Sequence, residues 1–532
     1  MDVPSPHLES GAAGGTTQLP DLPHEILHEI FSYFCAYCYD APIGWVPSYR
    51  REATYSCVWP VDARWDNEWF HTGRPTFDEH EFALGISTLL ALCRTSRVCR
   101  AIAEVYLYRF ISLSGMPGPF QYCGKRLLSL MNTIVSRPDL ASYINWLDIL
   151  CPLESLVAGL DMSPENIKPI SKAMKERFDW GDPWWTFPVD RRVILLRHIL
   201  ISYATKLQHL QYAAPTKTKF NGEIIFPALQ TLVFLPWDLE TRHIYDVKDV
   251  QEVLKAAPLL RSFCCVAGLR DEDLREDFSP NSIPPYPEFA NIVNLCLSGT
   301  RYLRPRLLTD IIISCGQLKV FSYNSDLSFL PPWNGLPPGP TDIITALGKH
   351  KASLRSLNLG FFLSESYKRF MNIAPHTTLD LRSFTRLEYV SIDTATFQTR
   401  DILQKLRLLG RGDEKPRGLP DILPLSVRVI RLWLSDIAAA VCNDLVHTKP
   451  YVEQLFPCLE EIHLCVSKWD EEARRLGQGQ WYIPKDPLIS PDLIPMVRRA
   501  FEGSNIKITT TEDQREYPMF DWTRPYRVNL LP

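Results

Sequence analysis

The feature that most constrains the fold is an apolar triplet, L-x-x-L-x-L, which occurs ten times beyond about residue 137. Most successive copies after Leu207 lie roughly 22 to 42 residues apart, and helical patterns precede several of them. The triplets are Ile144/Leu147/Ile149, Leu207/Leu210/Tyr212, Leu229/Leu232/Phe234, Leu260/Phe263/Cys265, Ile292/Leu295/Leu297, Leu318/Phe321/Tyr323, Leu354/Leu357/Leu359, Leu387/Val390/Ile392, Val429/Leu432/Leu434 and Leu459/Ile462/Leu464. A strand and a helix of this size have too little core alone, so the units must stack.

This repetition is typical of a leucine-rich-repeat solenoid, with a curved parallel sheet and helices on the convex side. Irregular spacing and 43 prolines predict a distorted arc with long loops. The alternative is an ordinary α/β domain, but ten triplets in order favour the solenoid, which we assign to residues 137–510, with a tail at 511–532. Helices are expected at Arg191–Thr205, Val247–Ala257, Leu307–Cys315, Asp342–His350 and Asp401–Leu409.

In each triplet the leucines point into the core, so the single residue between the last two points outward on the concave sheet. These outward positions are Asp148, Gln211, Val233, Cys264, Cys296, Ser322, Asn358, Ser391, Trp433 and His463. The set is nearly uncharged, whereas a phosphorylated target normally requires clustered arginines. We therefore predict recognition of a neutral or apolar target surface. Arginines from loops are the alternative.

Candidate target-binding residues on this surface are polar or aromatic. They are Gln211, Ser322, Asn358, Ser391, Arg431, Trp433 and His463. Trp433 is the one aromatic side chain expected outward near the end of the series, and Arg431 flanks it.

A separate helical pattern lies near the N-terminus. Leu19-Pro20-Asp21-Leu22-Pro23 gives an extended segment, and Pro23 suits a first helical turn, where its missing N–H costs nothing. Ile26, Leu27, Ile30, Phe31 and Phe34 then form one apolar stripe. The stripe is too short to bury itself and requires a partner surface.

A second helical segment runs from Ile86 to Arg109. Apolar residues recur at helical spacing through Leu89, Leu92 and Ile102, with no glycine or proline to interrupt them.

Together the two segments resemble an F-box, in the form found in fungal F-box proteins, followed by leucine-rich repeats. The resemblance implies binding to a Skp-type adaptor and, through it, to the cullin and RING subunits of a ubiquitin ligase. The implied adaptor-binding residues are Leu19, Pro20, Leu22, Pro23, Ile26, Leu27, Ile30, Phe31, Leu89, Leu92 and Ile102. Alternatively, the same residues cap the first repeat of the solenoid.

The F-box-like module is assigned to residues 19–112, after a Gly-, Ala-, Ser- and Thr-rich tail at 1–18 that is expected to be disordered. It departs from the family by an insert at 35–81, where a short turn is usual. Helical hairpins tolerate long loops at modest entropic cost, so the insert does not by itself exclude the module.

The sequence contains no recognisable catalytic or nucleotide-binding motif. There is no nucleotide-binding glycine loop and no G-x-S-x-G nucleophile elbow. Cys35 and Cys38, with Cys57, His71 and His80, admit a zinc site, but a second C-x-x-C is missing and buried thiols are the stronger interpretation. We expect neither a cofactor nor a metal.

Charge and hydropathy limit the classes of binding partner that the sequence predicts. The net charge of −4 argues against nucleic acid as a partner. The sequence contains no run of ~18 apolar residues, so no membrane span is predicted. The N-terminus lacks a secretory pattern, and the scattered cysteines suit reduced thiols in the cytoplasm or nucleus.

The sequence thus predicts a non-enzymatic substrate-recognition subunit of an SCF-type ubiquitin ligase, with an α+β to α/β fold. A non-catalytic scaffold outside a ligase is the first alternative, and an enzyme with a loop-built site is the second. The target protein is unknown.

Overall fold

The computed structural model describes residues 19–35, 79–113, 123–149, 163–178, 184–213, 225–235, 245–265, 269–270, 286–298, 303–326, 338–362, 380–393, 422–434, 438–466 and 492–511. The predicted N-terminal tail, most of the insert, the helix expected at Asp401–Leu409 and nearly all of the C-terminal tail lie outside these residues.

The described chain is built on one twelve-stranded sheet in which every pair of neighbours is parallel. Its strands follow chain order, which is the topology of a solenoid rather than of a doubly wound domain. The strands are β1 (Phe110–Ser112), β2 (Trp146–Ile149), β3 (His209–Ala213), β4 (Thr231–Leu235), β6 (Ser262–Cys265), β8 (Asn294–Ser298), β9 (Val320–Asp326), β10 (Ser356–Phe362), β11 (Tyr389–Asp393), β12 (Val429–Leu434), β13 (Glu461–Val466) and β14 (Lys507–Thr511). A separate parallel pair joins β5 (Tyr245–Asp246) and β7 (Leu269–Arg270).

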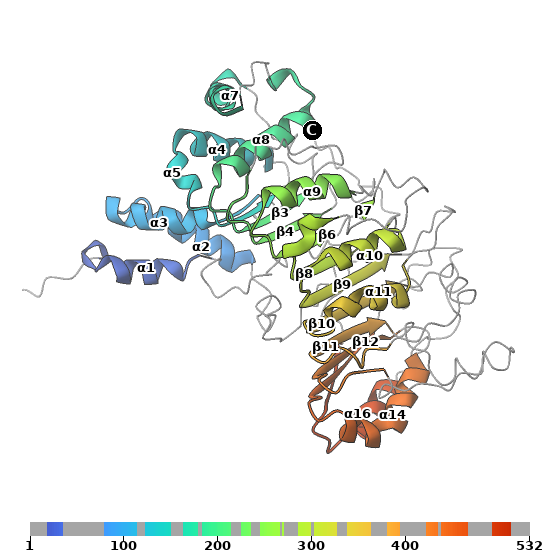
Figure 1. Ribbon diagram of the computed structural model, residues 1–532. Helices are drawn as coiled ribbons and strands as arrows, with labels where there is room; N and C mark the ends of the chain where they lie inside the picture. The colour runs from blue at the N-terminus through green and yellow to red at the C-terminus, as the bar shows by residue number, and fades with distance from the viewer. Residues whose placement is uncertain are drawn as a thin grey trace, which may run out of the picture.

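Helices cover one face of the sheet, as α9, α10 and α11 show most clearly in Figure 1. They are α4 (Cys123–Ser136), α5 (Pro138–Ala141), α7 (Pro164–Phe178), η3 (Trp184–Thr186), α8 (Val189–Tyr203), α9 (Val247–Ala256), η4 (Pro287–Asn291), α10 (Pro305–Ser314), α11 (Pro340–Leu347), η5 (Gly348–His350), α14 (Ala438–Leu455) and α16 (Leu493–Ala500). The helices expected near residues 191, 247, 307 and 342 are confirmed.

Local sequence explains where these helices begin and which face they bury. In α9, Asp246 caps the first turn by accepting a hydrogen bond from Lys248 N at 2.9 Å. Val250 and Leu254, four residues apart, then face the sheet and are buried. In α10, Pro305 occupies the first turn, where its missing N–H costs nothing.

The main core lies between the sheet and these helices and runs continuously through the solenoid. Leucines predicted to point inward, such as Leu210, Leu232 and Leu357, are all fully buried. The sheet begins earlier than expected, because β1 starts at Phe110, inside the range assigned to the F-box-like module. α4 also belongs to this core through Leu127 and Met131.

A second, smaller core belongs to the N-terminal helices, which lie beyond the first strands in Figure 1. They are η1 (Leu19–Asp21), α1 (His24–Ser32), α2 (Glu79–Leu92) and α3 (Arg97–Arg109). In the described part of the chain, no helix is both long and apolar enough to cross a membrane.

Candidate interaction surfaces

The two sequence segments on either side of the insert pack together as one three-helix module. Leu27 and Phe31 from α1 meet Leu89 from α2 and Ile102 from α3. Their exposed fractions are 0%, 0%, 0% and 3%. Cys35 belongs to the same core and donates its thiol hydrogen to the Tyr106 carbonyl oxygen at 3.5 Å. The insert therefore leaves the module intact.

This core corrects part of the predicted adaptor surface. Four residues that were expected to contact a partner are buried in this core and so cannot contact one. They are Leu27, Phe31, Leu89 and Ile102. The single apolar stripe read from α1 is in fact divided: one side packs on α3, and the other side remains outward.

The outward side of α1 carries Ile26, which is 43% exposed, whereas Ile30 one turn later is partly buried and packs against the core. Leu19 is exposed at 36%, and Leu90 on α2 at 44%. Pro23 is also exposed. The remaining predicted contact residues are partly buried: Pro20, Leu22 and Leu92.

The exposed apolar side chains are concentrated on this module. Five of the eleven large apolar side chains exposed in the described residues lie on it, although it is far smaller than the solenoid. Because these side chains lie outside the module's own core, they are candidates for contact with a partner.

Close packing between α2 and the turn that follows α1 depends on one glycine, Gly85. A Cβ atom placed on Gly85 would lie 2.7 Å from the carbonyl oxygen of Phe34. Real Cβ atoms essentially never approach a backbone oxygen this closely. The turn that follows α1 therefore rests directly on the backbone of α2.

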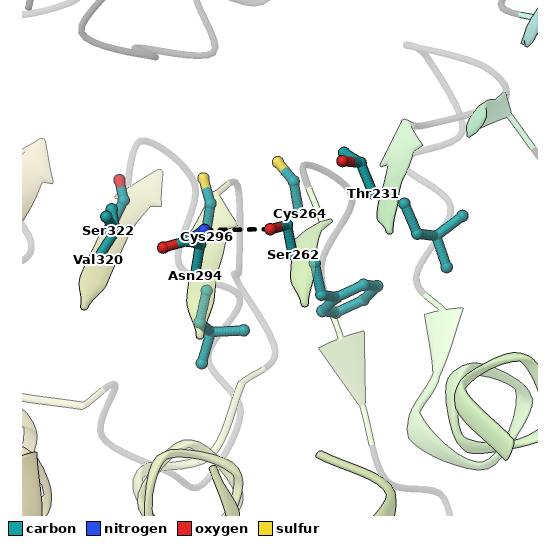
Figure 2. A pocket seen from close by; sticks show the side chains of 10 residues that line it. Thr231, Ser262, Cys264, Asn294, Cys296, Val320 and Ser322 are labelled. Carbon is teal, nitrogen blue, oxygen red and sulfur yellow. Dashed lines mark hydrogen bonds between the residues drawn. The ribbon is translucent and has the colours of Figure 1, made fainter. Parts of the chain in front are cut away.

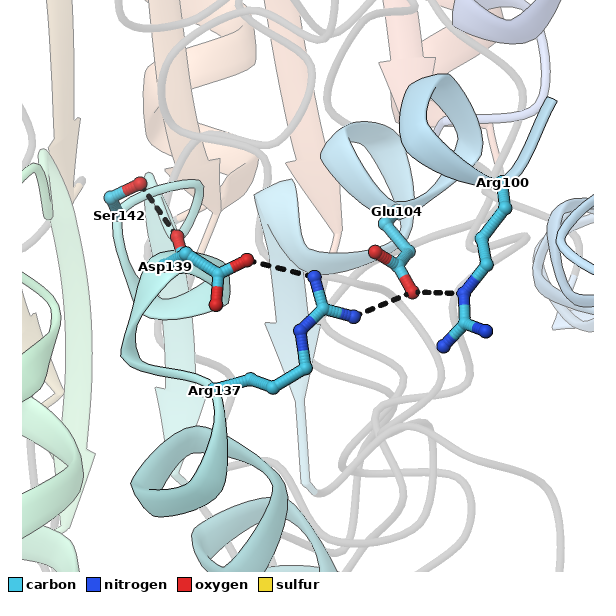
Figure 3. A network of polar contacts seen from close by, with 5 residues as sticks. All are labelled: Arg100, Glu104, Arg137, Asp139 and Ser142. Carbon is cyan, nitrogen blue, oxygen red and sulfur yellow. Dashed lines mark hydrogen bonds and ion pairs between the residues drawn. The ribbon is translucent and has the colours of Figure 1, made fainter. Parts of the chain in front are cut away.

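A polar network fixes the module to the solenoid (Figure 3). Glu104 on α3 accepts hydrogen bonds from Arg100 Nε at 2.8 Å and from Arg137 Nη1 at 3.0 Å. Arg137 also donates to Asp139 at the start of α5, at 2.7 Å. Burial alone would raise the pKa of Glu104, but hydrogen bonds from the two arginines outweigh it and lower that pKa. Because α3 also runs directly into β1, the module is joined to the repeats at two points.

Replacing Glu104 with glutamine is expected to weaken this junction by about 1–2 kcal/mol, because two charge-assisted hydrogen bonds lose their anionic acceptor. Hydrogen exchange of the α3 and α5 amides measures the effect. The matched control is Glu252→Gln, which removes an exposed pair with Lys255 and should cost less than about 1 kcal/mol. Equal protection in both variants would contradict the assigned role.

On the opposite, concave face, strand pairing defines one outward row, called here the ladder. In register it runs through Ser112, Asp148, Gln211, Val233, Cys264, Cys296, Ser322, Asn358, Ser391, Arg431, His463 and Thr509. All but one of the predicted outward positions therefore lie in this single row.

The exception is Trp433. Ser391 pairs with Arg431, and Arg431 pairs with His463, so the true triplet of β12 is Val427/Ile430/Leu432. Trp433 lies two residues further on, beside Asp393 and Cys465. The expectation that no arginine lies on the ladder is wrong, because Arg431 occupies it.

Most candidate target-binding residues on the ladder are buried. Gln211, Ser322, Asn358, Ser391 and Arg431 are all at most 6% exposed. Asn358 Nδ2 donates to Ser322 Oγ at 2.9 Å, a cross-strand bond that satisfies polar groups within the sheet.

His463, the last but one residue of the row, is more accessible, with a side chain 15% exposed. Its Nδ1 lies 2.6 Å from Thr509 Oγ1, and the Thr509 hydroxyl donates to Glu461 Oε1. The His463 ring, whose Nδ1 lies 3.8 Å from Glu461 Oε1, and the Thr509 hydroxyl together lower the pKa of Glu461. Burial alone would raise that pKa. The cluster holds a carboxylate, a hydroxyl and an imidazole in one hydrogen-bonded set at the C-terminal end of the ladder.

Within the described residues, no group of three or more histidine, cysteine, aspartate or glutamate side chains is placed to bind a metal ion. Of the residues considered for zinc, Cys35 is a core residue of the helical module, while Cys38, Cys57 and His71 lie outside the described residues. No family model and no curated protein matches this chain.

Proposed function

We propose that this chain is the substrate-recognition subunit of an SCF-type ubiquitin ligase. The carrying observation is the exposed apolar surface of a three-helix module whose own core is already complete. Its exposed large apolar side chains are Tyr33, Leu84, Leu90, Ile26 and Leu19. A Skp-type adaptor with an apolar groove is the partner that this surface and the F-box resemblance together favour.

The arrangement suits a subunit that positions another protein. The helical module is joined to the solenoid where α3 runs into β1 and where Glu104 binds Arg137, so a partner on the module and a target on the repeats are held at a fixed separation. The target is expected to contact the ladder near His463, because the ladder candidates before it are buried. The catalytic step belongs to other subunits of the ligase.

The test is co-purification with a recombinant Skp-type adaptor. Ile26→Asp is expected to reduce adaptor recovery at least about tenfold, because burying an unpaired carboxylate costs more than the ~1.4 kcal/mol that one decade of affinity requires. The module should stay folded, since Ile26 is largely outward.

The matched control is Ile225→Asp, the same change at an isoleucine 69% exposed on the solenoid. It should leave adaptor recovery unchanged. If the wild-type chain retains no adaptor, or if both variants retain it equally, the proposal fails. In the first case the module is better described as a cap or scaffold element.

A further inference from the structure

Two cysteines stand side by side on the concave face, in a part of the ladder that the proposed function does not use. Cys264 on β6 pairs in register with Cys296 on β8. Both belong to the outward row, and Figure 2 shows their sulfur atoms directed to the same side of the sheet. Both thiols are reduced, and they are 2% and 7% exposed. The neighbouring Cys265 points into the core instead.

A small cavity of about 20 Å³ adjoins the pair. Its lining includes Ser262, Asn294 and Ser322 besides the two cysteines. This volume accommodates one water molecule or one small ion, since a water needs ~10–15 Å³ on the same measure. A bulky ligand is excluded.

The sheet itself sets the distance between the sulfurs. Neighbouring strands lie ~4.7–4.9 Å apart, and side chains in register keep about that separation. A metal–thiolate bond is ~2.3 Å long, so two such bonds in line span about 4.6 Å.

We propose that Cys264 and Cys296 form a two-coordinate site for a soft monovalent cation, with Cu(I) as its natural occupant. Thiolates are soft ligands that select Cu(I), whereas zinc requires four ligands and the described surroundings supply no third histidine, cysteine or carboxylate. Binding forms two Cu–S bonds and releases two thiol protons to solvent, with no change in the oxidation state of copper or sulfur.

One hydroxyl group among the lining residues supports this charge change. The bound centre carries a net charge of −1, which requires a nearby donor. Ser322 is next to Cys296 in the ladder, and its oxygen already accepts a hydrogen bond from Asn358 at 2.9 Å. Its own hydroxyl proton can therefore be directed toward the sulfur of Cys296.

The experiment titrates the full reduced chain with Cu(I) under oxygen-free conditions against a chromophoric Cu(I) chelator. Cys264→Ser and Cys296→Ser should each bind one equivalent fewer than the wild-type chain. The control Cys458→Ser, at an exposed thiol elsewhere, should match the wild type. X-ray absorption of the wild type loaded with one equivalent should show two sulfur neighbours in line.

Unchanged Cu(I) stoichiometry in either site variant, with circular dichroism showing a folded chain, would overturn the proposal. So would three or four sulfur neighbours in the absorption spectrum.

Discussion

Gly85→Ala is expected to destabilise the helical module by about 1–3 kcal/mol, as overpacking of a tight contact usually does. The added Cβ would lie 2.7 Å from Phe34 O. A backbone carbonyl cannot rotate out of the way as a flexible side chain can, so the turn that follows α1 must move off α2 and displace α1 with it. Helix propensity alone predicts the opposite sign, since alanine is ~1 kcal/mol better than glycine in a helix. The sign of the stability change therefore shows whether steric overlap with Phe34 O or helix propensity dominates at this position.

The measurement is hydrogen exchange of the α1 and α3 amides, with the solenoid strands as an internal reference. Ser87→Ala is the matched control, because Ser87 is exposed on the same helix and alanine there should be neutral or slightly stabilising. Adaptor recovery should fall with Gly85→Ala, since Ile26 is carried by the displaced helix. If protection rises in both variants, Gly85 does not lie against the Phe34 carbonyl as closely as 2.7 Å.

Strand positions could be predicted because each repeat carries its own local signal. Nine of the ten predicted triplets coincide in register with strands of the sheet, since the inward leucines alternate with a fixed period. The two end strands were missed. In β1, Ile111 and Leu113 complete a triplet with Tyr108, but these residues continue directly from a helical pattern. In β14, threonine stands at Thr510 where a leucine would be expected.

The shift in β12 has a different cause. Val429-Ile430-Arg431-Leu432-Trp433-Leu434 is apolar at nearly every position, so two registers satisfy the triplet equally well. A strand shifted by two residues keeps the same faces, and only pairing with Ser391 and His463 shows which outward residue joins the ladder. Sequence alone placed Trp433 there.

The predicted adaptor surface was also only partly right, because it depends on contacts between segments that are distant in the sequence. Periodicity identified α1 as a helix with an apolar stripe, but it could not divide the stripe between core and surface. That division depends on α3, which is about seventy residues away in the sequence. The Gly85 contact and the Glu104–Arg137 pair were missed for the same reason: each joins segments whose separation in the sequence gives no pattern.

Acid is expected to destabilise the solenoid well above the pH at which carboxylates titrate. His198 and His209 are buried, and burial lowers the pKa of each from 6.5 to about 4, helped at His198 by the neighbouring Arg197. Burial likewise lowers the pKa of His350, which accepts a hydrogen bond from Leu318 N at 3.2 Å and lies 3.0 Å from Ile312 O. Each side chain is therefore held neutral inside the fold.

Proton uptake by the unfolded chain determines whether folding stability rises or falls with pH. Between pH 6.5 and about 4 the unfolded chain binds protons that the folded chain does not, so stability is fully present above pH 6.5 and falls as the pH falls through this window. The expected loss is about 2 kcal/mol for each of His198 and His209 between pH 7 and pH 5. Glu104 and Glu461, with lowered pKa values, contribute only below about their ordinary 4.5.

Urea unfolding followed by circular dichroism at pH 7 and pH 5 measures this loss. His209→Gln is expected to be less stable than the wild type at pH 7, because it disturbs the contact of His209 with Thr231 at 2.9 Å and the ring contact with Trp146. It should nevertheless lose about 2 kcal/mol less than the wild type on acidification, because glutamine binds no proton. His198→Gln should behave in the same way. A wild-type stability that is constant from pH 7 to pH 5, or a pH dependence that neither variant reduces, would show that these imidazoles are not held neutral by burial.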